Sequence, residues 1–212
     1  MKSLRNLFMV LVGCTLVATS FTSCLDDDED NITVTPEEAA RRLNIMNGTY
    51  QGKAYAFYNE DYKVKSDSTE TTFSISGRDS LLTVNLPVSF LSYAVRDKSD
   101  TKLIEALKNA GPQKVTFKIL LNDIYGENSS TTYGYYLYPA SYLKFTCAYE
   151  DQTYEVEIKF TTSASYFYTL NVVSYGVYDR GGANGYLPIG SVTVNQQTYA
   201  IEPIPFLVVG QK

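Results

Sequence analysis

Apolar and polar side chains alternate with a period of two along most of this chain after residue 48. The alternation is clearest where Tyr154, Val156, Ile158 and Phe160 are separated by charged residues. A period of two places successive side chains on opposite faces of an extended strand, so each such run is predicted to be a half-buried strand. The predicted strands are 49–58, 71–76, 82–86, 114–121, 132–138, 142–149, 153–161, 165–178, 190–195 and 199–209.

Short connections separate most of these runs. The polar turn at 150–152 joins 142–149 to 153–161 and makes this pair the clearest predicted hairpin. Repeated alternation of strands with helices, which is typical of a parallel sheet, does not occur in the pattern. The sequence therefore predicts a mainly β fold, an antiparallel sandwich or barrel of about nine or ten strands. It leaves open whether the interior is filled or hollow.

Two short helices are predicted beside these strands. Thr35 has the position of an N-cap, Pro36 that of the first helical residue, and Glu38 is placed to close a capping box. This helix should end near Asn47. The segment 100–110 begins with a capping aspartate and is followed by a Gly-Pro pair, which predicts the second helix.

Histidine is absent from the chain. Its absence excludes Ser-His-Asp and Cys-His catalysis, histidine-ligated zinc and imidazole-based pH switches. Glycoside hydrolysis needs only two carboxylates about 5–10 Å apart, but Glu150 and Asp151 lie in the predicted turn and no pair stands out. We therefore predict no enzyme, no metal site and no cofactor, and a carboxylate-based glycan hydrolase is the weakest alternative. The 19 tyrosines suit strands, and their rings are also able to stack on a ligand.

The N-terminus has the pattern of an exported protein. Lys2 and Arg5 precede an apolar stretch at 7–18, about the length of the apolar region of a signal peptide and shorter than the ~20 residues that span a bilayer. Small residues then precede Cys24. This arrangement resembles a bacterial lipoprotein signal, although Phe21 stands where that family usually has an aliphatic residue. The resemblance implies that Cys24 carries the lipid, whereas the alternative is an ordinary secretory peptide cleaved nearby.

An acidic run follows the cysteine and consists of Asp26, Asp27, Asp28, Glu29 and Asp30. Like charges at this density repel one another and favour a solvated tether. The run also resembles the surface-export signal of Bacteroidota lipoproteins, which implies display on the cell surface. A plain acidic spacer on a periplasm-facing lipoprotein is the alternative. Removal of residues 1–23 takes away two cations and no acid, which changes the net charge from −5 to −7, so nucleic acid is not an expected partner.

The domain organisation follows from these features: a signal peptide at 1–23, the lipidated cysteine and acidic tether at 24–34, and a single β-rich domain at 35–212. The whole layout resembles uncharacterised Bacteroidota lipoproteins with a domain of unknown function, some of which are calycin-like β-barrels. That resemblance implies an outer-membrane location and a fold class, and no activity. Within the domain, Cys147 alternates with apolar residues, which indicates a buried and inert thiol.

Three segments are candidate sites. Asp67-Ser68-Thr69 and Asp79-Ser80-Leu81 resemble the O-glycosylation pattern of exported Bacteroidota proteins, and we expect Ser68 and Ser80 to lie in turns. The glycine-dense segment 178–186 is interpreted as a long connection between strands. It is also a candidate binding loop, with Tyr178, Asp179, Arg180 and Tyr186 as its ligand-contacting residues.

The function predicted from the sequence is a lipid-anchored β domain that binds or supports a partner at the outer membrane. The membrane is contacted through the N-terminal lipid, and the partner is a glycan, a small ligand or a protein, as for an accessory or inhibitor module. The interior of the fold should discriminate among these. A cavity lined with tyrosines favours a small ligand, and a filled core favours contacts with another protein.

Overall fold

The computed structural model describes residues 34–60, 63–122, 131–161, 174–198 and 200–212. The predicted signal peptide, Cys24 and the acidic run therefore lie outside the described residues, as do positions 165–173 of the predicted strand 165–178. No helix in the described ranges combines the length and apolar character needed to cross a bilayer.

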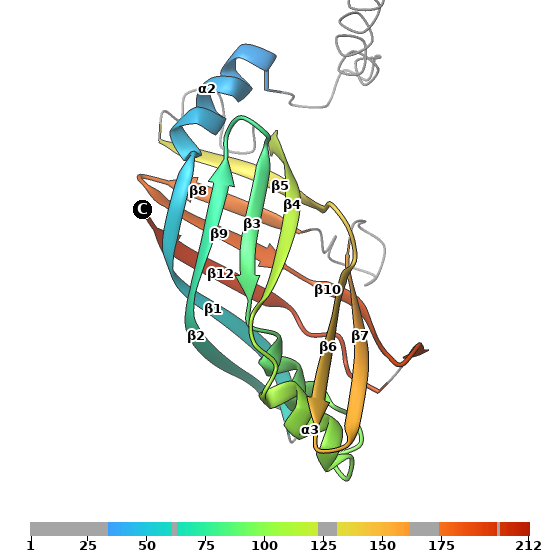
Figure 1. Cartoon of the computed structure of the whole chain (residues 1–212). Coiled ribbons are helices and arrows are strands. Elements are labelled where there is room, and N and C mark those ends of the chain that lie inside the picture. Colours follow the sequence, from blue (N-terminus) through green and yellow to red (C-terminus); the bar gives the residue numbers. More distant parts are fainter. Residues whose placement is uncertain (1–33, 61–62, 123–130, 162–173, 199) are drawn as a thin grey trace, which may run out of the picture. The chain divides into compact units, whose positions relative to one another are not determined.

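Eight antiparallel strands form a closed barrel (Figure 1). In spatial order they are β1 (Gly48–Glu60), β12 (Phe206–Gln211), β9 (Gly182–Leu187), β8 (Tyr175–Asp179), β5 (Thr132–Pro139), β4 (Gln113–Asn122), β3 (Leu81–Leu86) and β2 (Lys63–Ser76), and β2 closes the circle by pairing with β1. The mainly β antiparallel fold predicted from the alternation is confirmed, and of the two predicted architectures the barrel is present.

A second sheet has the order β11 (Gln197–Thr198), β10 (Ile189–Val194), β7 (Gln152–Phe160) and β6 (Leu143–Tyr149). The predicted hairpin is confirmed, since β6 and β7 pair from Leu143↔Ile158 to Tyr149↔Gln152. One face of this sheet is buried and includes Cys147, whose thiol pKa is raised by burial. The ring of Phe160 packs edge-on against that of Phe117 of the barrel at 5.1 Å, which joins the two sheets in one core.

In the described ranges, three short helices accompany the strands: α2 (Pro36–Met46), the 3₁₀ helix η2 (Val88–Ala94) and α3 (Thr101–Lys108). Both predicted helices are confirmed with their caps. The Thr35 hydroxyl accepts the Glu38 N–H at 3.3 Å, and the Asp100 carboxylate accepts the Leu103 N–H at 3.1 Å. The prediction did not include η2, which follows Pro87 where the chain leaves β3.

The helix α2 docks on the barrel through its C-terminal half. Met46 is fully buried, and its carbonyl accepts a hydrogen bond from the Tyr50 hydroxyl. The buried guanidinium of Arg42 lies 5.1 Å from the centre of the Tyr133 ring, a cation–π contact. Glu38 bonds to Arg41 and Arg42 and does not show the reciprocal bond of a capping box. The hydrogen bonds from the two arginines lower the pKa of Glu38 to about 2.

Large side chains fill the barrel. The largest fully buried ones are Tyr50, Tyr133, Tyr135, Phe117 and Phe206. Tyr50 stacks on Phe73 with ring centres 5.0 Å apart, and Tyr133 stacks on Tyr178 at 5.7 Å. The buried Tyr135 hydroxyl donates to the Asn184 carbonyl at 2.5 Å. The alternative that the sequence left open is thus decided in favour of a packed interior.

Three details of the predicted strands were wrong. The described residues contain twelve strands, two more than predicted, because the prediction missed the short β11 and because the glycine-rich segment interpreted as a long connection includes β9. Only Arg180 and Gly181 form the turn between β8 and β9. The run predicted at 199–209 is not one strand, since prolines at 203 and 205 precede β12 and proline cannot donate to a ladder. The strand predicted at 71–76 begins earlier, at Lys63.

We predict that Met46→Ala will lower the free energy of unfolding by about 2–5 kcal/mol, because it leaves a cavity beneath α2. Asn44→Ala, on the exposed side of the same helix, is the matched control and should change it by less than about 0.5 kcal/mol. Urea unfolding monitored by tyrosine fluorescence measures both. Equal midpoints for the two variants would contradict the docking of α2 on the core.

Candidate binding surface

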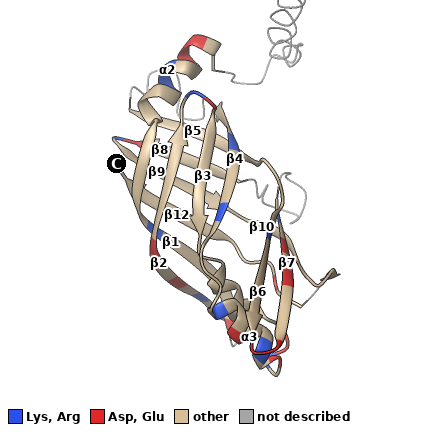
Figure 2. Ribbon diagram, in the orientation of Figure 1, with Lys and Arg blue, Asp and Glu red and all other residues tan. Residues whose placement is uncertain are grey.

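Four adjacent barrel strands, β5, β8, β9 and β12, form a wall almost without charge. Asp179, at the end of β8, is the only charged residue in these four strands. Figure 2 shows their ribbons in tan, while charges appear on β2, β4, β7 and the helices. An absence of charge at the centre of a surface, with aromatic enrichment, is characteristic of the core of protein interfaces.

The registers of these strands align one outward-facing row. Tyr136 pairs with Tyr175, Tyr175 with Tyr186, Tyr186 with Leu207, and Leu207 with Tyr55. Directly paired residues of antiparallel strands point to the same face, and their chain neighbours are buried inside the barrel. Leu120 of β4 extends the row beyond Tyr136. We name this row the aromatic belt; it consists of Leu120, Tyr136, Tyr175, Tyr186, Leu207 and Tyr55.

The belt is partly accessible along its length. Leu120 is 55% exposed and Tyr175 is 48% exposed. The rings of Tyr175 and Tyr186 lie 5.5 Å apart and are inclined at 43°, and burial raises the pKa of Tyr186. The Tyr175 and Tyr186 rings thus contact each other, and Tyr175 remains exposed enough to contact a partner. Beyond the wall, Lys53 of β1 and Glu70 of β2 lie 3.8 Å apart.

The four residues of the candidate binding loop are separated by the fold. Tyr178 is buried in the barrel against Tyr133. Asp179 and Arg180 are exposed at the tight β8–β9 turn, where the Asp179 carboxylate accepts a hydrogen bond from the Thr132 hydroxyl at 2.7 Å. Tyr186 belongs to the aromatic belt. The segment is therefore a hairpin and not an open loop, and one of its four candidate residues lies on the belt.

Sequence reasoning missed the other belt tyrosines. Tyr136 and Tyr175 appear in the sequence as ordinary strand residues, and only the pairing between strands brings them together. One feature of the sequence could have identified the belt: Tyr135 and Tyr136 are consecutive tyrosines in a predicted strand. Such a pair places one ring on each face of the strand.

The two candidate glycosylation residues lie in different surroundings. Ser68 is exposed in the middle of β2, opposite Tyr55, so its predicted place in a turn was wrong. Ser80 does lie in the turn between β2 and β3, with a positive φ of 53° and a half-buried side chain. The described residues thus leave Ser68 the more accessible of the two hydroxyls.

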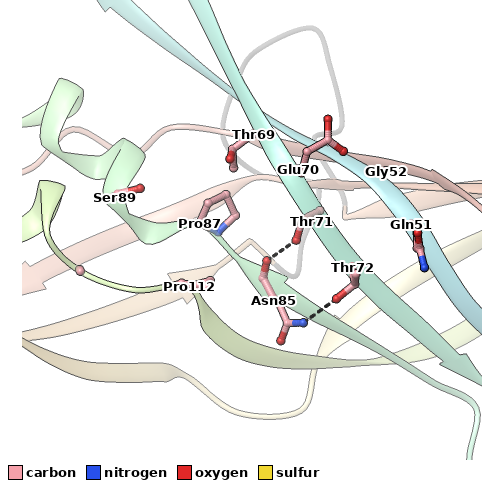
Figure 3. A pocket seen from close by; sticks show the side chains of 11 residues that line it. Gln51, Gly52, Thr69, Glu70, Thr71, Thr72, Asn85, Pro87, Ser89 and Pro112 are labelled. Atoms are coloured by element: carbon pink, nitrogen blue, oxygen red, sulfur yellow. Dashed lines mark hydrogen bonds between the residues drawn. The ribbon is translucent and has the colours of Figure 1, made fainter.

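A polar notch lies where β3 separates from β2 (Figure 3). It encloses about 470 Å³ between residues 69–72 of β2 and a wall formed by Pro87, Ser89 and Pro112. The Thr71 hydroxyl donates to the Asn85 carbonyl at 2.6 Å, and the Asn85 amide donates to the Thr72 hydroxyl at 2.9 Å. Glu70 is the one charged residue among those that line the notch.

The two carboxylates of the β6–β7 turn have a structural partner. Glu150 and Asp151 lie 3.1 and 2.8 Å from the Lys102 ammonium and so connect the β6–β7 turn to α3. These bonds raise the pKa of Lys102 and lower that of Asp151. In the described part of the chain, no group of three or more acidic or cysteine side chains is arranged to hold a metal ion.

The fold and the belt define a class: a closed antiparallel barrel with a packed interior and an uncharged, aromatic outer wall. Residues 45–183 match the family described as Domain of unknown function (DUF4840), and the chain belongs to this family. No curated protein sequence matches the chain.

One similar solved structure is that of HpuA from Kingella denitrificans in complex with human haemoglobin. The two chains are 9% identical with a TM-score of 0.24. The match covers 86% of this chain but 46% of that chain, so the present chain spans less than half the length of HpuA. A likeness at this TM-score carries no argument about function.

Proposed function

We propose that this protein is a lipid-anchored binding protein of the outer membrane, displayed on the cell surface as in Bacteroidota, and that it docks another protein on the aromatic belt. The observation that carries the proposal is the alignment of Tyr136, Tyr175 and Tyr186 across strands free of lysine and arginine, a row that continues through Leu207 to Tyr55 on β1. Tyrosine contributes large contact area at low entropic cost, and it is enriched in protein interfaces.

A protein partner suits the belt better than a small molecule does. The belt crosses six of the eight barrel strands and follows a curved arc of about 24 Å at the usual strand spacing of ~4.8 Å. A small molecule would contact only part of this arc, whereas a standard protein interface takes about 800 Å² on each partner. The barrel interior, where a small ligand would otherwise be enclosed, holds stacked rings.

A glycan is the second candidate, because exposed tyrosines are able to stack on sugar rings. The 43° angle between the Tyr175 and Tyr186 rings makes them a poor shared platform for flat sugar faces, which favours a protein. The proposal includes no catalytic step, since Glu150 and Asp151 are engaged by Lys102.

The anchor in this proposal is Cys24, which is followed by the acidic run and then by α2. About ten residues separate the cysteine from α2, which limits the reach of the tether to about 35 Å. A domain held that close to a membrane by two or three acyl chains would dissociate slowly. The belt would then meet partners that are embedded in, or bound to, the same surface.

We expect Cys24→Ala to release the protein from membranes, because the acyl chains supply the anchoring energy. Replacement of all five acids at 26–30 by Asn or Gln should leave it membrane-bound but protect it from protease added to intact cells. Fractionation and protease shaving, with a periplasmic protein as control, measure the two effects. Protection of the unmodified protein would place it on the periplasmic side.

The belt is tested by a photo-crosslinking amino acid placed at Tyr175 in intact cells. Tyr142, which is 56% exposed and lies off the belt, is the matched control position. We expect a discrete protein adduct from position 175 and none from 142, followed by an at least tenfold weaker Kd for the identified partner with Tyr175→Ala. A tenfold loss corresponds to about 1.4 kcal/mol, which exceeds the ~1 kcal/mol that most interface residues contribute. No adduct, together with Tyr175-dependent binding on a glycan array, would favour the glycan.

We also propose Ser68 as a glycan acceptor, with Ser80 as the less accessible second position. Ser68→Ala should remove a glycan-sized increment from the intact mass of the native protein, and Ser80→Ala should remove little or none. Thr69→Ala, the neighbouring exposed hydroxyl, is the control. A native mass equal to that of polypeptide plus lipid would refute the assignment.

A further inference from the structure

The strand β2 has a long unpaired edge. Its ladder with β3 covers only residues 73–76, whereas its ladder with β1 covers the whole strand from Lys63 to Ile75. The chain leaves β3 at Pro87 and turns into η2. From residue 72 back to 63, β2 therefore has one strand neighbour among the described strands, and the notch of Figure 3 is the place where the second neighbour ends.

An unpaired edge of this length is a template for pairing with another chain. Residues 63–66 and 68–70 are exposed, and Val64 is 75% exposed. The charges on this edge are ordered, with Lys63 and Lys65 in the first half and Asp67 and Glu70 in the second half. A second copy running antiparallel reverses this order, so cations of one copy would lie opposite anions of the other.

Strand geometry restricts how two copies pair. Residues opposite each other in an antiparallel ladder point to the same face, and side chains alternate between faces. A two-fold axis through the ladder therefore coincides with a residue and not with a peptide bond. An axis at Lys65 would place two lysines face to face, and an axis at Asp67 would place two aspartates face to face, both unfavourable.

An axis at Ser66 gives the complementary register. Lys65 of each copy then lies opposite Asp67 of the other, Val64 lies opposite Ser68, and Lys63 lies opposite Thr69. We propose that the β2 edge of this protein pairs with the β2 edge of a second copy in this register. The interface is isologous and closes as a dimer. The order of charges along the edge is complementary to itself in this arrangement.

The contacts that Asp67 makes in one copy are compatible with this pairing. Its carboxylate accepts hydrogen bonds from the Tyr93 hydroxyl at 3.1 Å and from the Ser68 N–H at 2.7 Å, and these two bonds hold it in place. Lys65 lies 3.7 Å from Glu60, and both side chains are about half exposed, so this contact is weak and leaves the ammonium able to turn toward a partner.

A ladder of seven residues is a small interface, and the dimer should be weak in dilute solution. Confinement to a surface raises the effective concentration and favours the paired state. The proposal does not depend on the aromatic belt, because β2 lies outside the uncharged wall. Pairing of two copies through β2 can therefore be measured without knowledge of the partner of the belt.

The test is a cysteine crosslink in the native membrane. At a Ser66 axis, the two Cα atoms of residue 66 lie about 4.5–5.5 Å apart, which is within the range of a disulfide. Val64 and Ser68 are each displaced by about 13 Å from their own equivalents, beyond that range. We expect Ser66→Cys to give a disulfide-linked dimer on a non-reducing gel after mild oxidation, and Val64→Cys and Ser68→Cys to give at least tenfold less.

A charge exchange tests the reason for the register. In the Ser66→Cys background, Asp67→Lys should reduce the dimer yield at least fivefold, and the further change Lys65→Asp should restore it. Both variants lack the bond to Tyr93, so restoration separates pairing from folding. Equal yields at 64, 66 and 68, a failure of restoration, or a Ser66→Cys adduct with another protein in place of the dimer would each overturn the proposal.

Discussion

The contact between the Tyr135 ring and Gly176 inside the barrel determines much of what lies outside it. A Cβ atom at Gly176 would come within 2.2 Å of the Tyr135 ring, so the glycine is the residue that lets this large ring lie opposite β8. The pairing Tyr135↔Gly176 sets the register of β5 with β8, and it places Tyr136 beside Tyr175 on the outer face. A slip by one residue would turn every side chain to the other face. The packed interior and the aromatic belt are thus two consequences of one register.

The parts of the fold that could be predicted are those with local sequence signals. The period-two alternation identifies most strands, and the Thr35 and Asp100 caps identify two helices, because both signals are local. The strand β9 was missed because its glycines look like those of a loop. A Cβ atom at Gly182 would lie 2.5 Å from the Gln211 side chain, and one at Gly185 would lie 3.3 Å from the Val208 side chain and 3.4 Å from that of Leu137. Glycine relieves this crowding between neighbouring strands, a role that a single sequence does not display.

The candidate site was less predictable than the fold for a related physical reason. A binding surface on a barrel consists of residues from neighbouring strands, and those strands are far apart in the sequence. Tyr55 and Leu207 are adjacent on the belt, although one lies near the beginning of the domain's sequence and the other near its end. Only Tyr186 was among the residues selected from sequence, and it was selected for its place in a glycine-rich segment. The tyrosine count indicated the kind of surface, and the registers were required to locate it.

The two proposed surfaces differ in the forces that would act on them. The belt presents rings without lysine or arginine, so salt should change its association little, whereas the β2 edge depends on ordered charges that salt screens over about 10 Å. The charged residues are distributed accordingly. The four strands of the uncharged wall contain one acid, whereas β2 contains Lys63, Lys65, Asp67 and Glu70. Since β1 is paired on one side to β12 and on the other to β2, a dimer formed through β2 would leave the belt of each copy uncovered by the ladder itself. Pairing of copies and docking of a partner are therefore compatible in one assembly. A dimer would present two belts, and a partner with two or more copies of its binding site would bind such a dimer more tightly than it binds a monomer.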